Sequence, residues 1–159
     1  MDLFDPEYLL FFSCAAKCHL RYLIIGGYAV NYYGYLRNTH DLDIWLAPTN
    51  ENRDAFINTL LCMNYSESEV EPLRSENFTE HYVGTIGAVN SSLDFITIVH
   101  HTISFDDAET DKVSFAITDD VSIHYVPYKF LVDMKLFARR EKDLLDISEL
   151  NKIKKIRKQ

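Results

Sequence analysis

The segment DLDIWL at residues 41–46 alternates acidic or aromatic side chains with aliphatic ones. Successive side chains of a strand point to opposite faces of a sheet, so the alternation predicts a β-strand with Asp41, Asp43 and Trp45 on one face. The three aliphatic residues then occupy the other face. Two carboxylates on one face can bind hard cations together, although an ordinary solvated strand shows the same pattern.

A pair of glycines lies shortly upstream of this acidic strand. Tyr22 to Ile25 reads as a short strand, and Gly26-Gly27 ends it and opens a helix to about Tyr33, which Gly34 ends. Backbone N–H groups at such a turn suit the β and γ phosphates of a nucleotide. A glycine pair alone is also an ordinary turn.

Apolar periodicity predicts four further helices in the chain. A packed helix covers Glu7 to His19, a second runs from a cap at Thr49 or Asn50 to about Met63, a third runs from Pro127 to about Arg140, and a last one begins near Asp143. Two polar segments read as connections, Asn64–Phe78 and Asp106–Asp111.

Four more stretches have the composition of strands. They are His81–Ile86, Leu93–Val99, Val113–Ile117 and Val121–Val126. Residues 88–92 have the composition of a hairpin connection, which predicts antiparallel pairing of the first two. The fold class predicted is α/β of the α+β type, with a mixed, partly antiparallel sheet flanked by helices.

Length and composition predict one globular domain over residues 1–150, followed by a basic tail at 151–159. The chain has 159 residues, 47% of them hydrophobic, and a formal net charge of -8. Such a charge opposes general affinity for a phosphate backbone. The tail, NKIKKIRKQ, holds five of the 16 basic residues and no acidic one, so it is either simply solvated or contacts RNA or an acidic partner.

The cysteines and the apolar runs predict a cytoplasmic protein without a membrane segment. Leu9 to Phe12 is too short to span a bilayer, and no cationic stretch precedes it as in a secretory signal. Cys14, Cys18 and Cys62 are odd in number and lack the spacing of a disulfide framework, so we expect reduced thiols.

A third carboxylate, Asp94, lies inside the predicted strand that begins at Leu93. Apolar residues flank it in Ser92-Leu93-Asp94-Phe95, where an acid is costly unless it has partners. A metal site supplies such partners, and water at a hairpin edge is the alternative.

Taken together, these residues resemble the signature of minimal nucleotidyltransferases of the DNA polymerase beta-like superfamily. Gly26-Gly27 followed by Arg37-x-Thr39-x-Asp41-x-Asp43 carries the resemblance, which is nearest to the AbiEii toxin-like group. It implies a palm-like fold, a glycine pair that meets a nucleoside triphosphate, and two Mg²⁺ ions, with Mn²⁺ as a substitute. The metal ligands it implies are Asp41, Asp43 and Asp94, the last of which helps to activate the acceptor hydroxyl.

The C-terminal part of the chain also resembles an element of that group. Lys135 is followed by Arg140-x-Lys142-Asp143-x-x-Asp146. Lys135 and Arg37 are expected to reach phosphates, whereas Arg140 and the two aspartates either serve the site or only form i, i+3 pairs that orient the last two helices. Thr39 contacts phosphate or fixes the turn before the metal strand, and Tyr28, near the glycine turn, is a candidate to contact the nucleobase.

The function implied is transfer of a nucleoside monophosphate from a triphosphate to a hydroxyl of tRNA or other RNA, a protein or a small molecule. The resemblance also implies a toxin with an antitoxin partner. An antibiotic nucleotidyltransferase and a nucleotide-binding scaffold without activity are the alternatives. No second helical domain is evident, so we expect a homodimer or a partner to complete the acceptor surface.

Overall fold

The structure, a computed structural model, describes residues 5–88 and 91–156. In this part of the chain six strands form one open, mixed sheet in the order β3-β4-β2-β1-β6-β5. The strands are β1 (Tyr22–Ile24), β2 (Leu42–Leu46), β3 (Val83–Ala88), β4 (Ser91–Ile96), β5 (Val113–Ala116) and β6 (Ser122–Tyr125). The predicted α/β class with a mixed, partly antiparallel sheet is confirmed.

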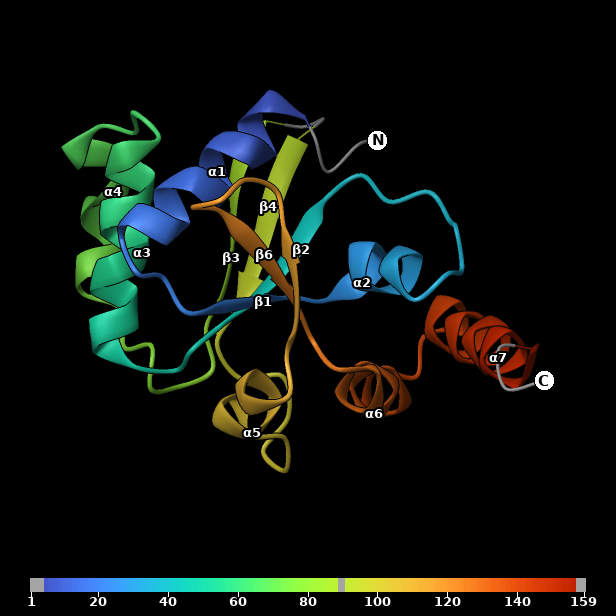
Figure 1. Cartoon of the computed structure of the whole chain (residues 1–159). Coiled ribbons are helices and arrows are strands. Elements are labelled where there is room, and N and C mark those ends of the chain that lie inside the picture. The colour runs from blue at the N-terminus through green and yellow to red at the C-terminus, as the bar shows by residue number, and fades with distance from the viewer. Residues whose placement is uncertain (1–4, 89–90, 157–159) are drawn as a thin grey trace.

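Seven helices within the described residues surround the sheet (Figure 1). They are α1 (Pro6–Lys17), α2 (Gly26–Tyr32), α3 (Asn50–Cys62), α4 (Glu67–Arg74), α5 (Phe105–Thr110), α6 (Tyr128–Ala138) and α7 (Glu141–Ile156). Figure 1 shows α1, α3 and α4 grouped at one side of the sheet and α2, α6 and α7 at the other. The last helix continues through residue 150 without a break, so the segment that the sequence sets apart as a tail begins as its final turns.

The acidic strand β2 lies at the centre of the sheet. It pairs antiparallel with β1 and parallel with β4, whereas β3 and β4 form the antiparallel pair expected from the hairpin composition. Residues 89–90 of that connection lie outside the described residues. The alternation of β2 gives Trp45 the same face as Asp43, and Trp45 is buried there against Phe105 of α5.

Two segments that were expected to be loops contain short helices. α4 lies within Asn64–Phe78, where the Glu69 carboxylate accepts hydrogen bonds from the N–H (2.8 Å) and hydroxyl (2.6 Å) of Ser66. This capping arrangement is a sequence signal for a helix start, but polar residues and Pro72 obscure the helix that follows. α5 occupies most of the other polar segment, where Phe105 and Ala108 are its buried residues.

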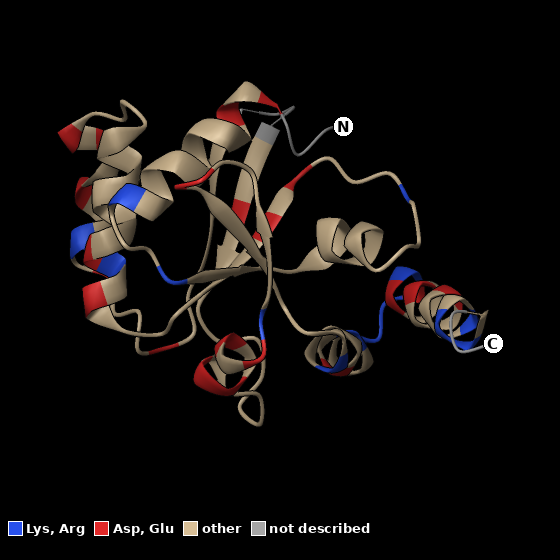
Figure 2. Ribbon diagram, in the orientation of Figure 1, with Lys and Arg blue, Asp and Glu red and all other residues tan. Residues whose placement is uncertain are grey.

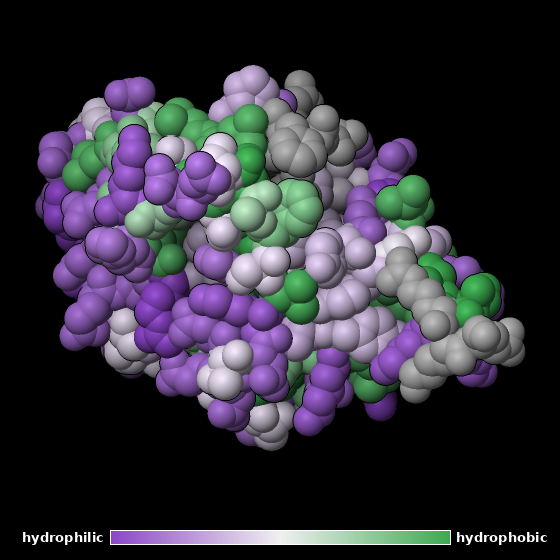
Figure 3. All heavy atoms as spheres, viewed as in Figure 1, coloured by the Kyte–Doolittle hydropathy of each residue, from purple (hydrophilic) through white to green (hydrophobic). Residues whose placement is uncertain are grey.

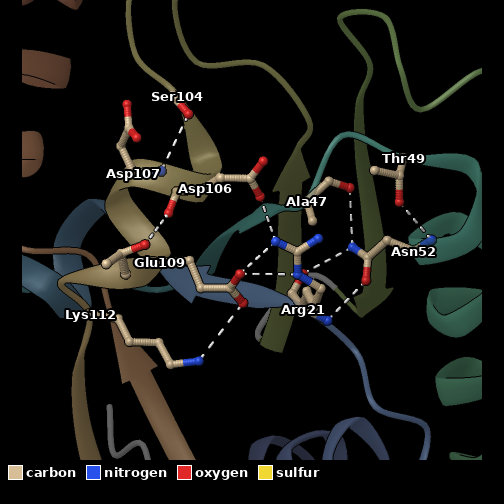
Figure 4. Close-up of polar contacts among 10 residues, drawn as sticks. Arg21, Ala47, Thr49, Asn52, Ser104, Asp106, Asp107, Glu109 and Lys112 are labelled. Atoms are coloured by element: carbon tan, nitrogen blue, oxygen red, sulfur yellow. Dashed lines mark hydrogen bonds and ion pairs between the residues drawn. The ribbon is translucent and has the colours of Figure 1, made fainter.

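A polar cluster ties the start of β1 to helices on two sides (Figure 4). The backbone N–H of Arg21 donates to the side chain of Asn52 on α3, which donates back to the Arg21 carbonyl, each at 2.9 Å. The Arg21 guanidinium contacts Glu109 (2.6 Å) and Asp106 on α5. These contacts fix the beginning of β1, an inner strand of the sheet that leads to Gly26.

The prediction of reduced thiols is wrong for two of the three cysteines. Cys14 on α1 and Cys62 at the end of α3 form a disulfide, with 5.7 Å between their Cα atoms, and Cys18 is free. The two half-cystines are 48 residues apart in the sequence, and only the packing of α1 on α3 brings them together. The cysteines therefore no longer support a reducing compartment, and the cytoplasmic location stays a prediction.

Candidate active site

The parallel pairing of β2 and β4 places two of the predicted acids side by side. Asp43 and Asp94 are register partners, so their side chains leave the same face of the sheet on strands about 5 Å apart. Figure 2 shows the acidic positions of these two strands near the middle of the sheet. Thr85 on β3 donates a hydrogen bond of 2.7 Å to the Asp94 carboxylate.

Asp41 directly precedes β2 and has a partner of its own. The Ser92 hydroxyl on β4 donates a hydrogen bond of 2.5 Å to Oδ1 of Asp41. Within residues 5–88 and 91–156, no three His, Cys, Asp or Glu side chains converge closely enough to hold a metal ion. The three predicted acids are thus neighbours held by separate hydrogen-bond partners, rather than one gathered ligand set.

Electrostatics couple these neighbours at Asp43. Burial raises the pKa of the Asp43 carboxyl, and the nearby charges of Asp94 and Asp41 raise it further. A hydrogen bond from the Gly27 backbone N–H and the more distant Lys142 lower it, without reversing the shift. An ionised Asp43 is therefore an unfavourable charge that a bound cation would stabilise.

The glycine pair is required by how closely the acidic strand approaches it. Gly26 has a φ of +61°, and a Cβ at this residue would collide with the Asp43 carboxylate. A Cβ on Gly27 would collide with the side chain of Thr39. Close packing therefore explains why both residues are glycines, independently of the predicted contact with phosphate.

Arg37 and Thr39 lie in the connection between α2 and β2, against the glycine turn. The Thr39 hydroxyl donates a hydrogen bond to the Asp41 carbonyl (3.4 Å). This contact fits the prediction that Thr39 fixes the turn before the acidic strand. Asn31 of α2 braces Arg37 through both backbone groups, at 2.9 and 3.0 Å. The Arg37 Nε lies 3.1 Å from Oδ1 of Asp146 without the alignment of a hydrogen bond.

A buried ionic cluster joins α6 to α7. The Lys135 ammonium donates to Asp146 at 2.7 Å and to Asp143 at 3.3 Å, and all three side chains are almost fully buried. Burial alone would raise the pKa of Asp143, but the hydrogen bond from Arg140 (2.7 Å) and the charge of Lys135 lower it below its usual value. Arg140 and Asp143 form the i, i+3 ion pair that was one of the two interpretations of this segment, the other being a role in the site.

A cleft of about 220 Å³ lies where these elements meet. Its lining contains Asp43 and Gly26 together with four cationic side chains, Arg37, Lys135, Arg140 and Lys142, which we call the cationic wall. The charged lining residues are Arg37, Asp43, Lys135, Arg140, Lys142 and Asp143, and the apolar ones include Ile25, Ile96, Val99, Leu131 and Met134. An anionic ligand with a bound cation suits this distribution of charge.

The structure thus gathers only part of the predicted site around the cleft. Gly26, Arg37, Asp43 and Lys135 line it, whereas Asp41 and Asp94 are neighbours of Asp43 that do not line the cleft. Tyr28 is 3% exposed and packs edge-to-face on Tyr8 in the core, away from the cleft. The prediction that Tyr28 contacts a nucleobase therefore has no support from its position. Aromatic residues at helical spacing usually face a core, and Tyr28 does so.

Sequence reasoning missed several residues that organise the site. Asn31, Thr85 and Ser92 are neutral polar residues whose partners lie on other elements, and no spacing rule links them to the acids. Lys142 lines the cleft from the start of α7. Only the pairing of β4 with its neighbours reveals the two hydroxyls.

No known family model matches this chain, and no curated protein is significantly similar to it in sequence. The resemblance to minimal nucleotidyltransferases therefore depends on the site residues alone. Every helix in the described part of the chain is too short or too polar to cross a membrane.

Proposed function

We propose that the protein is a metal-dependent nucleotidyltransferase that moves a nucleoside monophosphate from a triphosphate to an acceptor hydroxyl. One observation carries the proposal: the partly buried Asp43 carboxylate, with Asp94 and Asp41 as neighbours, lines a cleft whose lining also contains four cationic side chains. Hard carboxylate oxygens and guanidinium and ammonium groups are what a magnesium-bound triphosphate needs.

The acids fit Mg²⁺ by their chemistry, with Mn²⁺ as a substitute. Asp43 is the carboxylate whose charge is least compensated, because burial and two like charges all oppose its ionisation. Asp41 and Asp94 would join it by turning from their hydroxyl partners. When bound, the metal ions would neutralise the triphosphate and the departing pyrophosphate and would activate the acceptor hydroxyl.

The cationic wall would hold the phosphates. Arg37 lines the cleft from the α2–β2 connection, and Arg140 and Lys142 line it from the residue before α7 and from its first turn. A guanidinium matches phosphate oxygens in a bidentate way. Lys135 is held by Asp143 and Asp146, so it would act on a phosphate from a fixed position in the lining of the cleft. A fixed cation costs little reorganisation when charge develops on the leaving group.

Label transfer tests the proposal directly. The protein is incubated with each α-³²P-labelled nucleoside triphosphate, Mg²⁺ and total RNA, protein or aminoglycoside acceptors, and both labelled product and pyrophosphate are measured. Asp43→Asn should reduce transfer by at least about 10²-fold, since it removes a carboxylate that would act on the metal. Asp54→Asn, an exposed acid on α3, is the matched control and should keep wild-type activity. Equal transfer by Asp43→Asn and wild type would contradict the proposal.

A nucleotide-binding scaffold without activity is the second candidate. The observation that favours it is that the described acids do not converge, while the cationic wall is already assembled. Calorimetry separates the two candidates. A scaffold should bind ATP equally with Mg²⁺ and with EDTA, whereas the affinity of the enzyme should collapse when the metal is chelated.

The acceptor follows from the resemblance alone, which implies RNA, a protein or a small molecule. An antitoxin partner and an antibiotic as substrate are predictions of the same kind, and the homodimer is a prediction from the lack of an evident second helical domain. The label-transfer assay ranks the acceptors without assuming any of them.

A further inference from the structure

The phenol of Tyr8 contacts the backbone of the residues on either side of Asp41. Tyr8 lies in the first turn of α1 and is 2% exposed. Its hydroxyl lies 3.3 Å from the carbonyl oxygen of His40, and its oxygen accepts a hydrogen bond from the backbone N–H of Leu42. One side chain therefore contacts the residue before Asp41 and the residue after it.

The same hydroxyl also reaches the other strand that fixes Asp41. It lies 3.3 Å from the carbonyl oxygen of Ser92, and the Ser92 side chain donates to the Asp41 carboxylate. The single phenol hydrogen serves either carbonyl, while the phenol oxygen accepts from Leu42. Tyr8 thus occupies the end of the β2–β4 ladder, where register pairing begins at Leu42 and Leu93.

We infer that Tyr8 is a positioning residue for Asp41, a role that depends on the proposed metal-dependent function. Its phenol fixes the backbone of Asp41 against β4 and so places that carboxylate beside Asp43. The ring itself is held in the core, edge-to-face on Tyr28 with 6.0 Å between ring centroids. Removal of the hydroxyl leaves the ring packing in place and frees the two carbonyls and the Leu42 amide.

Tyr22 provides a matched control. It is 3% exposed and packs on Phe11 and Phe12, which belong to the same helix as Tyr8. Its hydroxyl is buried without a hydrogen-bond partner among the residues that the structure describes. Tyr22→Phe therefore removes an equally buried hydroxyl without touching the segment around Asp41.

Manganese binding tests the inference without an activity assay. Free Mn²⁺ is titrated by electron paramagnetic resonance against wild type, Tyr8→Phe, Tyr22→Phe and Asp43→Asn, well below each melting temperature. We expect Tyr8→Phe to bind Mn²⁺ about tenfold more weakly, the size of one lost hydrogen bond, and Tyr22→Phe to match wild type. Hydrogen exchange of the Leu42 amide should accelerate in Tyr8→Phe only.

The outcomes separate this inference from the proposed function. If wild type binds Mn²⁺ and Tyr8→Phe binds it equally well, the positioning role is overturned and the metal site stands. If both Phe variants weaken binding alike, the effect belongs to the core and the positioning role is again overturned. If wild type binds no Mn²⁺, the metal-dependent function fails, and the role of Tyr8 fails with it.

Discussion

Two groups of aspartates in this protein have opposite electrostatic surroundings. At the beginning of β2, Asp43 has Asp94 and Asp41 as neighbours, and its pKa is raised by burial and then by their charge. On α7, Asp143 and Asp146 are even less exposed, yet Lys135 and Arg140 compensate them, and the pKa of Asp143 is lowered. Desolvation raises the pKa of Asp43 and opposes ionisation of Asp143 as well, so the counter-charge makes the difference.

If the proposed function holds, the comparison separates a group that mainly joins two helices from a group that needs a bound cation. A compensated buried cluster joins helices, and loss of one member leaves a charge without a partner. An uncompensated group destabilises the unliganded protein and is retained where a ligand supplies the missing charge. Figure 2 shows acidic and basic positions together on α7, whereas β2 and β4 carry acidic positions only. On the face shown in Figure 3, by contrast, apolar residues occur in small groups among hydrophilic ones.

The largest effect is expected at the compensated cluster. Lys135→Met should lower the free energy of unfolding by about 3–5 kcal/mol, because Asp143 and Asp146 lose their shared buried cation. Urea denaturation measures the change. Lys152→Met, which breaks an exposed pair with Glu149, is the matched control and should have no resolvable effect. A small loss for Lys135→Met would remove the distinction between the two groups.

Gly26→Ala should disturb the uncompensated group next most strongly. The left-handed backbone alone costs about 1–2 kcal/mol with a Cβ, and the collision displaces the Asp43 carboxylate as well. Gly34→Ala, at a φ of 108°, tests backbone strain away from the acids. We expect both variants to melt earlier and only Gly26→Ala to lose Mn²⁺ affinity. Retained affinity in Gly26→Ala would show that the close approach is dispensable.

Asp43→Asn should have the opposite sign from the cluster variants. At pH 7 without metal it should raise the melting temperature by a few degrees, because it removes a buried charge that its neighbours oppose. It should also remove the stabilisation by added Mn²⁺ that wild type gains. Thermal scans with and without metal measure both effects, and a lower melting temperature for the variant would contradict the assignment.

The smallest effect is a pH dependence. Because the folded-state pKa of Asp43 is raised, its penalty develops as pH rises above the ordinary value of 3.8 and is absent at lower pH. The stability difference between Asp43→Asn and wild type should therefore shrink as the solution is acidified towards pH 3.8. Urea titrations at several pH values measure this, and a difference independent of pH would exclude Asp43 as its cause.

Local patterns predicted much of the framework and some of the site. The alternation at residues 41–46, the glycine turn and the apolar stripes predicted β2, α2 and most other elements, because these signals act within a few residues. α4 and α5 were missed because each buries only two residues, which is too few to show the apolar periodicity of a helix. The disulfide was missed because Cys14 and Cys62 meet only through helix packing.

The sequence by itself determined that Asp43 and Asp94 lie on strands and that Gly26 and Gly27 make a turn, whereas the predicted strand began one residue too early, at Asp41. Tertiary structure alone decided that Asp94 is the register partner of Asp43, that Tyr8 holds the segment around Asp41, and that Tyr28 belongs to the core. The reason is physical: side-chain periodicity is a property of the backbone, whereas pairing and burial depend on which distant elements share a core.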